Sequence, residues 1–373
     1  MKDAALPFAG RTVTLALSAR DYGSAGPPER DAVIRELESL GCRALRVVDG
    51  DPAGLECDLL ILYRNCRTLR HYPKLLMRRP ENRPRTAMWQ IDPLPPRVLD
   101  RRLEGQALRL AELFAHRRLL RPLEILVSWP LYSAIAKRGL GSFSDPKNGY
   151  FVDPPMARTT VETYAAIRRG VAEGWLDRAY VSTVGKQRFL SERGIDAGFA
   201  PFGVYQGLAD DRHLTRDIDV LFIGTLRKRH RRDALPRIMR EIGKTGARVE
   251  VVGGGVYGNA RIELLKRTRV VLHIHKYPWD TPWIRWTMAA ANGALMVSEP
   301  LTDPTPFEPG VHYFEAPVDE LPATVAGLLA NPELLQATAT RCRDFVRERF
   351  TLRGSLEAML SDFFAPRPEE RAT

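Results

Sequence analysis

The chain contains little cysteine and no long apolar segment. Four of its 373 residues are cysteines, and none of them is spaced as a CxxC pair or as a zinc ligand set. This scarcity argues against a disulfide-rich secreted domain or a zinc module and is typical of reduced thiols in a cytoplasmic protein. No run of about 20 apolar residues occurs, so we expect no transmembrane helix. Gly10 and Arg11 precede the first short apolar run, which predicts a strand there rather than a signal peptide.

Acidic residues are fewer than basic ones. The chain has 45 Asp and Glu against 56 Lys and Arg, which gives a formal net charge of +11. Three interpretations stay open: scattered arginines without a function, a cleft for a small anionic substrate, and a continuous basic face for nucleic acid. The 44% of hydrophobic residues supply enough apolar material for more than one core, as the chain length also indicates.

The basic segment Gly224–Asp233 lacks both the Lys-Ser/Thr pair of a Walker loop and the dinucleotide-binding fingerprint. It follows a strand-like run, and six of its ten residues are Arg, Lys or His. A glycine permits a sharp turn, a helix N-terminus attracts anions, and arginine binds phosphate through two donors. The pattern therefore predicts a phosphate site, against the alternative of an exposed basic turn. The arginines that qualify are Arg227, Arg229, Arg231 and Arg232.

Strand-like and helix-like segments alternate through both halves of the chain. An apolar run at 11–19 is followed by helical spacing at 30–41, and the alternation restarts after a polar linker near Tyr205. The stretch from Pro122 to Pro155 has no clear pattern. This α/β alternation predicts two Rossmann-like domains, each with a parallel sheet, facing each other across a cleft where ligands bind. The expected boundaries are 1–205, 206–350 and a C-terminal segment at 351–373.

Two further strand ends carry candidate binding residues. One ends in three glycines, of which Gly253 and Gly254 would let a nucleotide base or sugar lie close to the backbone; a flexible turn is the alternative. The other places His273 and His275 on one face of a strand, with Lys276 beside them. A third metal ligand is missing from this stretch, so we predict no metal site. His275 and Lys276 are instead candidates for contact with an anionic or polar ligand.

The runs "VLHIHKY", "IRWTMAAANGA" and "PFEPGVHYF" occur in this order in the second half. Together with the strand and basic loop before them, they resemble the C-terminal domain of GT-B glycosyltransferases over about Ile218 to Phe350. The pattern is most similar to the spore-maturation CgeB-like group and to families 1 and 4. "APFGVY" resembles the hinge before that domain, and the last helix resembles a tail that packs back on the first domain. The N-terminal half resembles the family in layout alone.

The resemblance implies an enzyme that moves a sugar from a nucleotide-sugar donor, such as a UDP- or GDP-sugar, to an acceptor. The acceptor is unknown: a small molecule, glycan, protein or nucleic acid. No permanently bound cofactor and no metal are implied, because cationic residues and amide protons would neutralise the leaving diphosphate. The residues expected to bind the donor are Gly224, Thr225, Arg227, Arg232, Gly253, Gly254, His275, Lys276, Arg285 and Glu308.

One position departs from the family pattern. The acid that usually holds the donor ribose falls at Met288, and a thioether cannot take its place as a strong hydrogen-bond acceptor. Three explanations are open: Glu299 or Glu308 serves instead, the donor is atypical, or activity is lost.

An inverting enzyme also needs a base near the acceptor hydroxyl. Asp21 and Asp92 follow strands in the first half and are the catalytic candidates, with His71 weaker; aspartates that cap a loop are the alternative. Tryptophans could stack on a sugar or base or pack in the core. These are Trp89, Trp129, Trp279, Trp283 and Trp286.

Two other functions compete with glycosyl transfer. A protein that binds or modifies nucleic acid would need the basic runs at 63–85 and 227–232 on one continuous surface. A catalytically silent GT-B-like binding protein is the other possibility, and Met288 motivates it.

Overall fold

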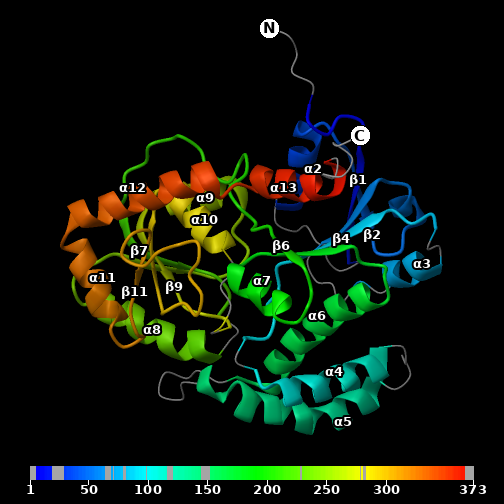
Figure 1. Cartoon of the computed structure of the whole chain (residues 1–373). Coiled ribbons are helices and arrows are strands. Elements are labelled where there is room, and N and C mark those ends of the chain that lie inside the picture. Colours follow the sequence, from blue (N-terminus) through cyan, green and yellow to red (C-terminus); the bar gives the residue numbers. More distant parts are fainter. Residues whose placement is uncertain are drawn as a thin grey trace.

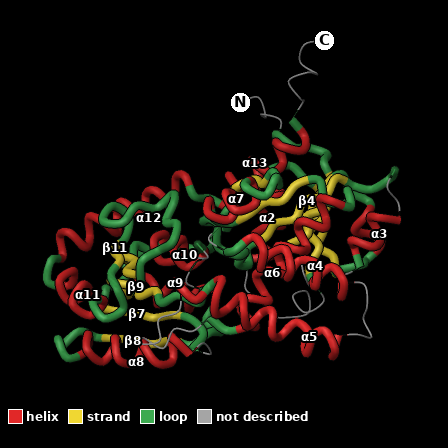
Figure 2. Tube along the Cα trace, turned by 60° about the horizontal axis from the view of Figure 1, so that its bottom comes forward, coloured by secondary structure: helices red, strands yellow, loops and turns green. Residues whose placement is uncertain are grey.

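A computed structural model of the protein describes residues 6–18, 29–63, 69, 71–78, 81–97, 99–115, 121–143, 152–226, 229–277, 279 and 283–365. Two sheet-based lobes lie side by side (Figures 1 and 2). The first lobe holds a six-stranded sheet and the second a five-stranded one, and all strand pairs in both sheets are parallel. The predicted α/β class with two Rossmann-like sheets is thus confirmed.

The sheet of the first lobe has the order β2-β1-β3-β4-β5-β6. Its central strands are apolar on both faces, as expected for parallel strands covered by helices on each side. The strands are β1 (Thr12–Leu17), β2 (Arg43–Val48), β3 (Leu59–Tyr63), β4 (Arg85–Gln90), β5 (Arg178–Val181) and β6 (Ala197–Phe199).

Helices cover both faces of this sheet, and a pair of outer helices, α4 and α5, packs against α6 (Figure 1). The helices are α2 (Glu29–Ser39), α3 (Tyr72–Arg78), α4 (Arg101–Ala115), α5 (Arg121–Ala134), α6 (Pro154–Ala172) and α7 (Val184–Ser191). Short helical turns lie at Pro52–Leu55, Ile135–Gly139 and Gly141–Phe143. Helix α5 lies in the stretch where the sequence has no clear pattern.

The sheet of the second lobe has the order β11-β10-β9-β7-β8. Its strands are β7 (Ile218–Ile223), β8 (Val249–Val252), β9 (Thr268–His273), β10 (Leu295–Ser298) and β11 (Phe314–Glu315). Side chains of α8 and α11 pack with one face of the sheet, and those of α10 pack with the other. The helices are α8 (Arg229–Gly243), α9 (Gly258–Lys266), α10 (Ile284–Ala291), α11 (Leu321–Leu329), α12 (Pro332–Arg349) and α13 (Leu352–Phe364).

The chain crosses between the lobes twice, and the two crossings pair with each other. The Val204 amide donates to the Phe350 carbonyl and the Leu352 amide to the Val204 carbonyl, both at 2.8 Å. After the second crossing, α13 packs against α2 of the first lobe, and Tyr180 donates its hydroxyl to Asp362 at 2.8 Å. One hydrophobic cluster continues through this junction into both lobes.

Gly203 lies where the two crossings touch. A Cβ added there would stand 2.3 Å from the Phe350 carbonyl oxygen, which is backbone and cannot move aside cheaply. We expect Gly203→Ala to lower the free energy of unfolding by about 1–3 kcal/mol, as overpacking usually does. Urea titration measures the change. In Gly327→Ala, the control within α11, the new methyl meets open space and should stabilise by about 0.5–1 kcal/mol. Equal effects of the two substitutions would contradict the paired crossing.

Candidate donor site at the carboxyl edge of the second sheet

The second sheet has its switch point between β7 and β9. The chain runs from β7 outward to β8 and then returns to form β9 on the other side of β7. In open parallel sheets, loops diverge at such a point and leave a crevice at the carboxyl ends of the strands. Gly224 follows β7, and His273 and His275 lie at the end of β9. The topology therefore places these three residues at the edge where a ligand site is expected.

Gly224 makes room for a guanidinium group. Its φ of 152° disfavours other residues, and an added Cβ would lie 2.6 Å from Nη2 of Arg285. Arg285 is in the first turn of α10, so this short helix and the loop after β7 meet at the guanidinium. Nη1 of Arg285 donates to Nδ1 of His273 at 2.7 Å.

A second guanidinium, that of Arg231, ties the same loops together. It donates to the Ile274 carbonyl from Nε at 3.0 Å and from Nη2 at 2.7 Å, and to the Thr225 carbonyl from Nη1 at 3.3 Å. Both guanidinium carbons lie 5.7 Å from the ring centroid of Phe222, within cation–π range. Arg231 is therefore positioned by backbone carbonyls that it bridges across the switch point.

His273 must be neutral in this arrangement. Arginine has only donors, so the Nδ1 atom that faces Arg285 has to accept, and the proton of the ring is on Nε2. Burial lowers the pKa of His273 far below its ordinary value, and the charges of Arg285, His275 and Arg231 lower it further. Nε2 is buried and has no hydrogen-bond partner among the described residues, as is also true of the Ser298 hydroxyl and the Trp286 indole nitrogen.

The positive charge of Arg285 has no carboxylate partner in the described part of the chain. Within the described residues, its guanidinium contacts His273, the Phe222 ring and Gly224, and no acidic side chain pairs with it. Burial lowers the pKa of Arg285 to about 9, and the charge of Arg231 contributes to the shift. A half-buried cation with a neutral partner is unfavourable unless an anion completes it.

Glu299, which follows β10, is buried and contacts two histidines, His230 and His275. One carboxylate oxygen accepts from His230 at 2.8 Å, and the other accepts the His275 amide at 2.6 Å. Burial alone would raise the pKa of Glu299, but the hydrogen bond from His230 and the charge of His275 outweigh it and hold the pKa low. Glu299 thus fixes the start of α8 and the loop after β9 to each other.

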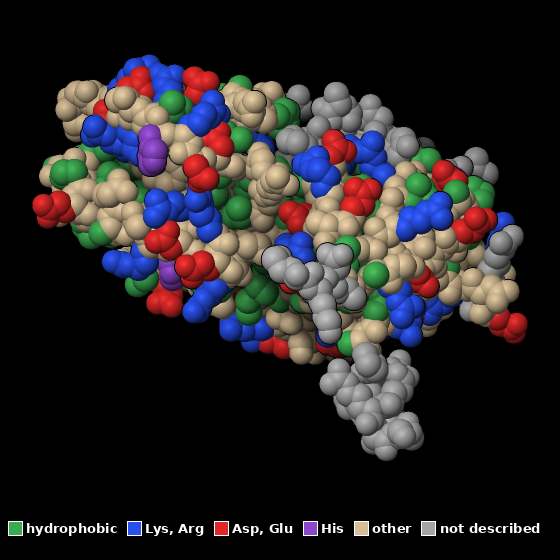
Figure 3. Space-filling view, turned by 90° about the horizontal axis from the view of Figure 1, so that it is seen from above, with side chains coloured by type: hydrophobic (Ala, Val, Ile, Leu, Met, Phe, Trp, Pro, Cys, Tyr) green, Lys and Arg blue, Asp and Glu red, His purple; other side chains and the backbone are tan. Residues whose placement is uncertain are grey.

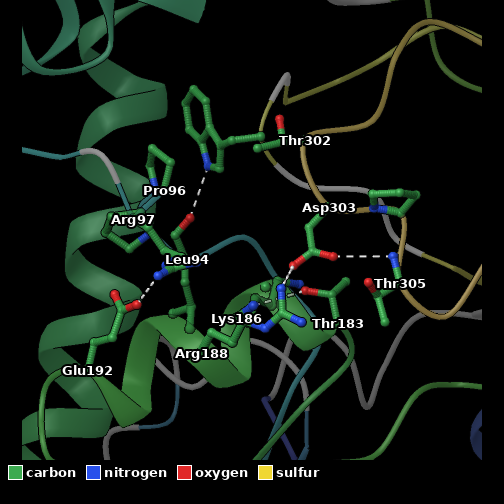
Figure 4. Close-up of a pocket in the computed structure, with 14 residues that line it drawn as sticks. Leu94, Pro96, Arg97, Thr183, Lys186, Arg188, Glu192, Thr302, Asp303 and Thr305 are labelled. Carbon is green, nitrogen blue, oxygen red and sulfur yellow. Dashed lines mark hydrogen bonds and ion pairs between the residues drawn. The ribbon is translucent and has the colours of Figure 1, made fainter.

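A pocket of about 670 Å³ lies between the lobes (Figure 4). The loop after β4 and helix α7 form its wall in the first lobe, and Trp279 with the segment 302–305 forms its wall in the second. The indole nitrogen of Trp279 donates to the Leu94 carbonyl at 2.9 Å, and Arg188 donates to Asp303 at 3.3 Å. These contacts join the lobes at the two sides of the pocket.

Residues 227–361 match the glycosyl transferase-like family. Sucrose-phosphate synthase from Thermosynechococcus elongatus has a similar fold over 95% of this chain and 99% of its own, with a TM-score of 0.56 and 11% identity. HepE from Anabaena is similar over 95% and 100%, with a TM-score of 0.53 and 10% identity. At such identities these structures establish the fold alone, and the family match covers the C-terminal part of the chain. The chain has the GT-B fold, and its C-terminal part is similar to glycosyl transferases. No curated protein matches it significantly.

Several predicted donor residues lie around the switch point of the second sheet. Gly224, Thr225, His275 and Arg285 surround the switch point, and the Nδ1 atom of His275 is buried with no partner in the described part of the chain. Other predicted residues lie further out: Gly253 and Gly254 in an exposed turn after β8, and Lys276 exposed over the Tyr277 ring. Their roles, like those of the first group, stay predictions.

Two arginines of the basic segment, Arg227 and Arg232, are predicted to bind the donor, and the structure describes the second of them. Arg227 lies outside the described residues. The Arg232 side chain is 66% exposed and pairs with Asp233 at 3.5 Å. The structure brings Arg231 rather than Arg232 to the loops around Gly224. Arg231 continues the apolar stripe of α8 formed by Ala234, Leu235 and Ile238, and this helical spacing could have singled it out.

The acidic candidates are dispersed. Asp21 lies outside the described residues, and Asp92 is half-buried in the loop after β4 that leads to the pocket. Glu308 is exposed in its turn, whereas both oxygens of Glu299 are engaged by His230 and His275. His71 is exposed and bonded through its amide to Asp49.

Met288 and most of the tryptophans are buried. Met288 is 9% exposed in the apolar face of α10. Trp89, Trp283 and Trp286 lie in the same core cluster as Met288, Trp279 lines the pocket, and Trp129 is half-exposed. In the described part of the chain, no set of three His, Cys, Asp or Glu side chains has a metal-binding arrangement. Nor does any described helix combine the length and apolarity that crossing a bilayer requires.

The buried carboxylate of Glu299 should make stability depend on pH. Its pKa is lowered on folding, so its contribution is present above the ordinary value of 4.5 and is lost as the pH falls below it. We expect Glu299→Gln to reduce the free energy of unfolding by about 1–3 kcal/mol at neutral pH, with a smaller loss in acid.

Urea titrations near pH 7 and near pH 4 measure this difference. Glu241→Gln is the matched control, because Glu241 also has a lowered pKa but its pair with Lys244 is exposed. That control should leave stability almost unchanged, because an exposed ion pair contributes little. A Glu299→Gln protein as stable as the control at neutral pH would contradict the role of the carboxylate.

Proposed function

We propose that the protein is a glycosyltransferase that uses a nucleoside diphosphate sugar as donor and binds its diphosphate between Gly224, Arg285 and the start of α8. The acceptor would approach from the first lobe through the interlobe pocket. The observation that carries this proposal is the Arg285 guanidinium, which lies against Gly224 with a neutral histidine as its hydrogen-bond partner. A diphosphate is a strong acceptor-only group and would complete this donor set.

The chemistry of sugar transfer explains why such a donor set is useful. When the bond between the anomeric carbon and the phosphate oxygen breaks, negative charge accumulates on the leaving diphosphate. Fixed guanidinium groups and amide protons stabilise this charge without having to reorganise, and they do so more strongly in the transition state than in the ground state. Arg285 would supply the charge directly, and Arg231 would hold the loops that surround it. No metal is required in this scheme.

A uridine nucleotide is a reasonable first donor to test. HepE, whose fold this chain shares, has been crystallised with UDP and glucose. The base-binding region of the present chain would lie beyond Gly253 and Gly254, where the turn after β8 is open. Met288 stands where the family pattern has an acid for the ribose, so the choice of nucleotide has to be established by measurement.

The distribution of surface charge favours a small substrate over nucleic acid. On the face seen in Figure 3, Lys and Arg alternate with Asp and Glu and do not form one continuous basic area. Several arginines of α12 and α13 are paired with acids, among them Arg347 with Asp211 and Arg353 with Glu357. Such pairing removes much of the field that a polyanion would need.

The proposal predicts which arginine matters. Arg285→Gln should weaken binding of the correct nucleoside diphosphate at least about tenfold, since a charge-assisted hydrogen bond is lost. Calorimetry with UDP, GDP, dTDP and ADP measures this effect. Arg237→Gln is the matched control, because Arg237 is on the same helix α8 but pairs with Asp319 at the surface.

Arg232→Gln, measured alongside, decides whether the exposed arginine chosen from the sequence also contributes. If Arg232→Gln lowers the affinity for the nucleotide tenfold or more, the site extends to the outer face of α8. If Arg285→Gln binds every nucleotide as the wild type does, the diphosphate does not occupy the switch point.

A further inference from the structure

Four buried polar atoms near Arg285 have no hydrogen-bond partner among the described residues. They are Nε2 of His273, Nδ1 of His275, the hydroxyl oxygen of Ser298 and the indole nitrogen of Trp286, and each of these residues is at most 4% exposed. Folded proteins leave few such atoms unpaired, because burial removes their hydrogen bonds to water. The proposed donor site uses none of the four atoms, so they need a separate explanation.

The second sheet and α10 bring three of these side chains together. His273 and Ser298 are register partners on the neighbouring parallel strands β9 and β10. Val271 and Met296, two positions before them, belong to the core cluster that also contains the buried face of α10. Since side chains two positions apart lie on the same face of a strand, His273 and Ser298 face α10. Trp286 extends from that helix, and its ring centroid lies 4.9 Å from that of His273.

The ring of His275 lies beside that of His273, with the two ring centroids 5.3 Å apart and the planes at 76°. Nε2 of His275 lies 3.0 Å from the Pro300 carbonyl oxygen. A carbonyl can only accept, so the ring proton of His275 is on Nε2 and its Nδ1 atom is an acceptor. The two rings therefore present one donor, Nε2 of His273, and one acceptor, Nδ1 of His275, and both atoms lack a direct partner in the described part of the chain.

Donors and acceptors are balanced in this group of atoms. His273 and Trp286 each supply an N–H donor, His275 supplies a lone pair, and the Ser298 hydroxyl can donate or accept. A small anion would suit the donors but would face the lone pair of His275, and a metal cation would face two N–H groups. A water molecule accepts two hydrogen bonds and donates two, so it can engage all four groups. Buried waters typically make about three hydrogen bonds to groups of this kind.

We infer that one water molecule is bound between His273 and His275, with Trp286 and Ser298 as its other partners. It accepts from the N–H groups of His273 and Trp286 and donates to Nδ1 of His275 and to the Ser298 hydroxyl.

The water completes a chain of hydrogen bonds that runs in one direction. Arg285 donates to Nδ1 of His273, whose Nε2 donates to the water; the water donates to Nδ1 of His275, whose Nε2 donates to the Pro300 carbonyl. The direction is fixed at both ends, because a guanidinium cannot accept and a carbonyl cannot donate. The cation at one end polarises the bonds that follow, and hydrogen bonds in such chains strengthen one another.

The chain makes His273 a positioning residue for Arg285. The water holds the Nε2 side of the ring, so Nδ1 stays directed at the guanidinium as its acceptor. The loop after β9 and the loop after β10 are thereby joined to the same cation through the two histidines. The inference does not depend on which ligand Arg285 binds, and it stands apart from the proposed function.

Ser298→Ala in the full chain tests the site through the sign of its effect on stability. Removing a buried hydroxyl that has no partner should leave the melting temperature unchanged or raise it. Removing one that binds a water should lower the melting temperature, by roughly 2–4 °C. Thr338→Val is the matched control, because the Thr338 hydroxyl on α12 is also buried without a described partner. The control should not lower the melting temperature.

A crystal structure of the wild type grown with sodium bromide identifies the occupant. We expect one solvent peak within about 3 Å of Nε2 of His273 and of Nδ1 of His275, without an anomalous bromide signal. Nitrogen NMR of the protein labelled with ¹⁵N-histidine measures the direction of the chain, and both rings should carry their proton on Nε2. Ser298→Ala should shift the Nε2 resonance of His273, whereas Thr338→Val should not.

The inference is overturned if no solvent peak lies between the two rings, or if the peak carries a bromide signal and the occupant is an anion. It is also overturned if Ser298→Ala melts like the control, or if either ring carries its proton on Nδ1. None of these measurements involves a nucleotide. The water site can therefore fail while the proposed donor stands, and the reverse is equally possible.

Discussion

The arrangement at the second sheet depends on one contact, the Arg285 guanidinium lying against Gly224. The contact requires a glycine, since a Cβ would fall 2.6 Å from Nη2. It also fixes the tautomer of His273, because a guanidinium can only donate to Nδ1. The charge stays without a carboxylate partner among the described residues, and burial lowers the pKa of Arg285 to about 9. The fold thus keeps a cation beside a neutral histidine, an arrangement that the proposed diphosphate would complete.

The rest of the second lobe serves to hold that cation in place. Arg231 bridges the loops after β7 and β9, and Glu299 bridges the loop after β9 and the start of α8. The first lobe is joined to this edge by paired backbone crossings at Val204 and Phe350 and by contacts on both sides of the pocket. The edge around Arg285 and the pocket therefore differ in charge: among the described residues Arg285 has no carboxylate partner, whereas Arg97 and Arg188 at the pocket each have one.

Periodicity predicted the sheets and most helices, because buried parallel strands are continuous apolar runs. Helix α5 escaped prediction because Pro130 lies inside it, and its packing against α4 and α6 compensates for a proline that disfavours a helix. The basic segment predicted an anion site at the end of β7, but composition could not decide which arginine faces inward. Arg231 continues the apolar stripe of α8, whereas Arg232 falls on the exposed side. The Glu299 bridge joins a loop and a helix start that are distant in sequence, so no local pattern reveals it.

A crystal structure of the protein with its best-binding nucleoside diphosphate tests the central claim most directly. We expect a phosphate oxygen within about 3 Å of the Arg285 guanidinium, with the diphosphate next to Gly224 and the start of α8. A diphosphate bound elsewhere on the protein, with Arg285 still paired to His273 alone, would contradict the claim that this buried cation exists to bind the leaving group.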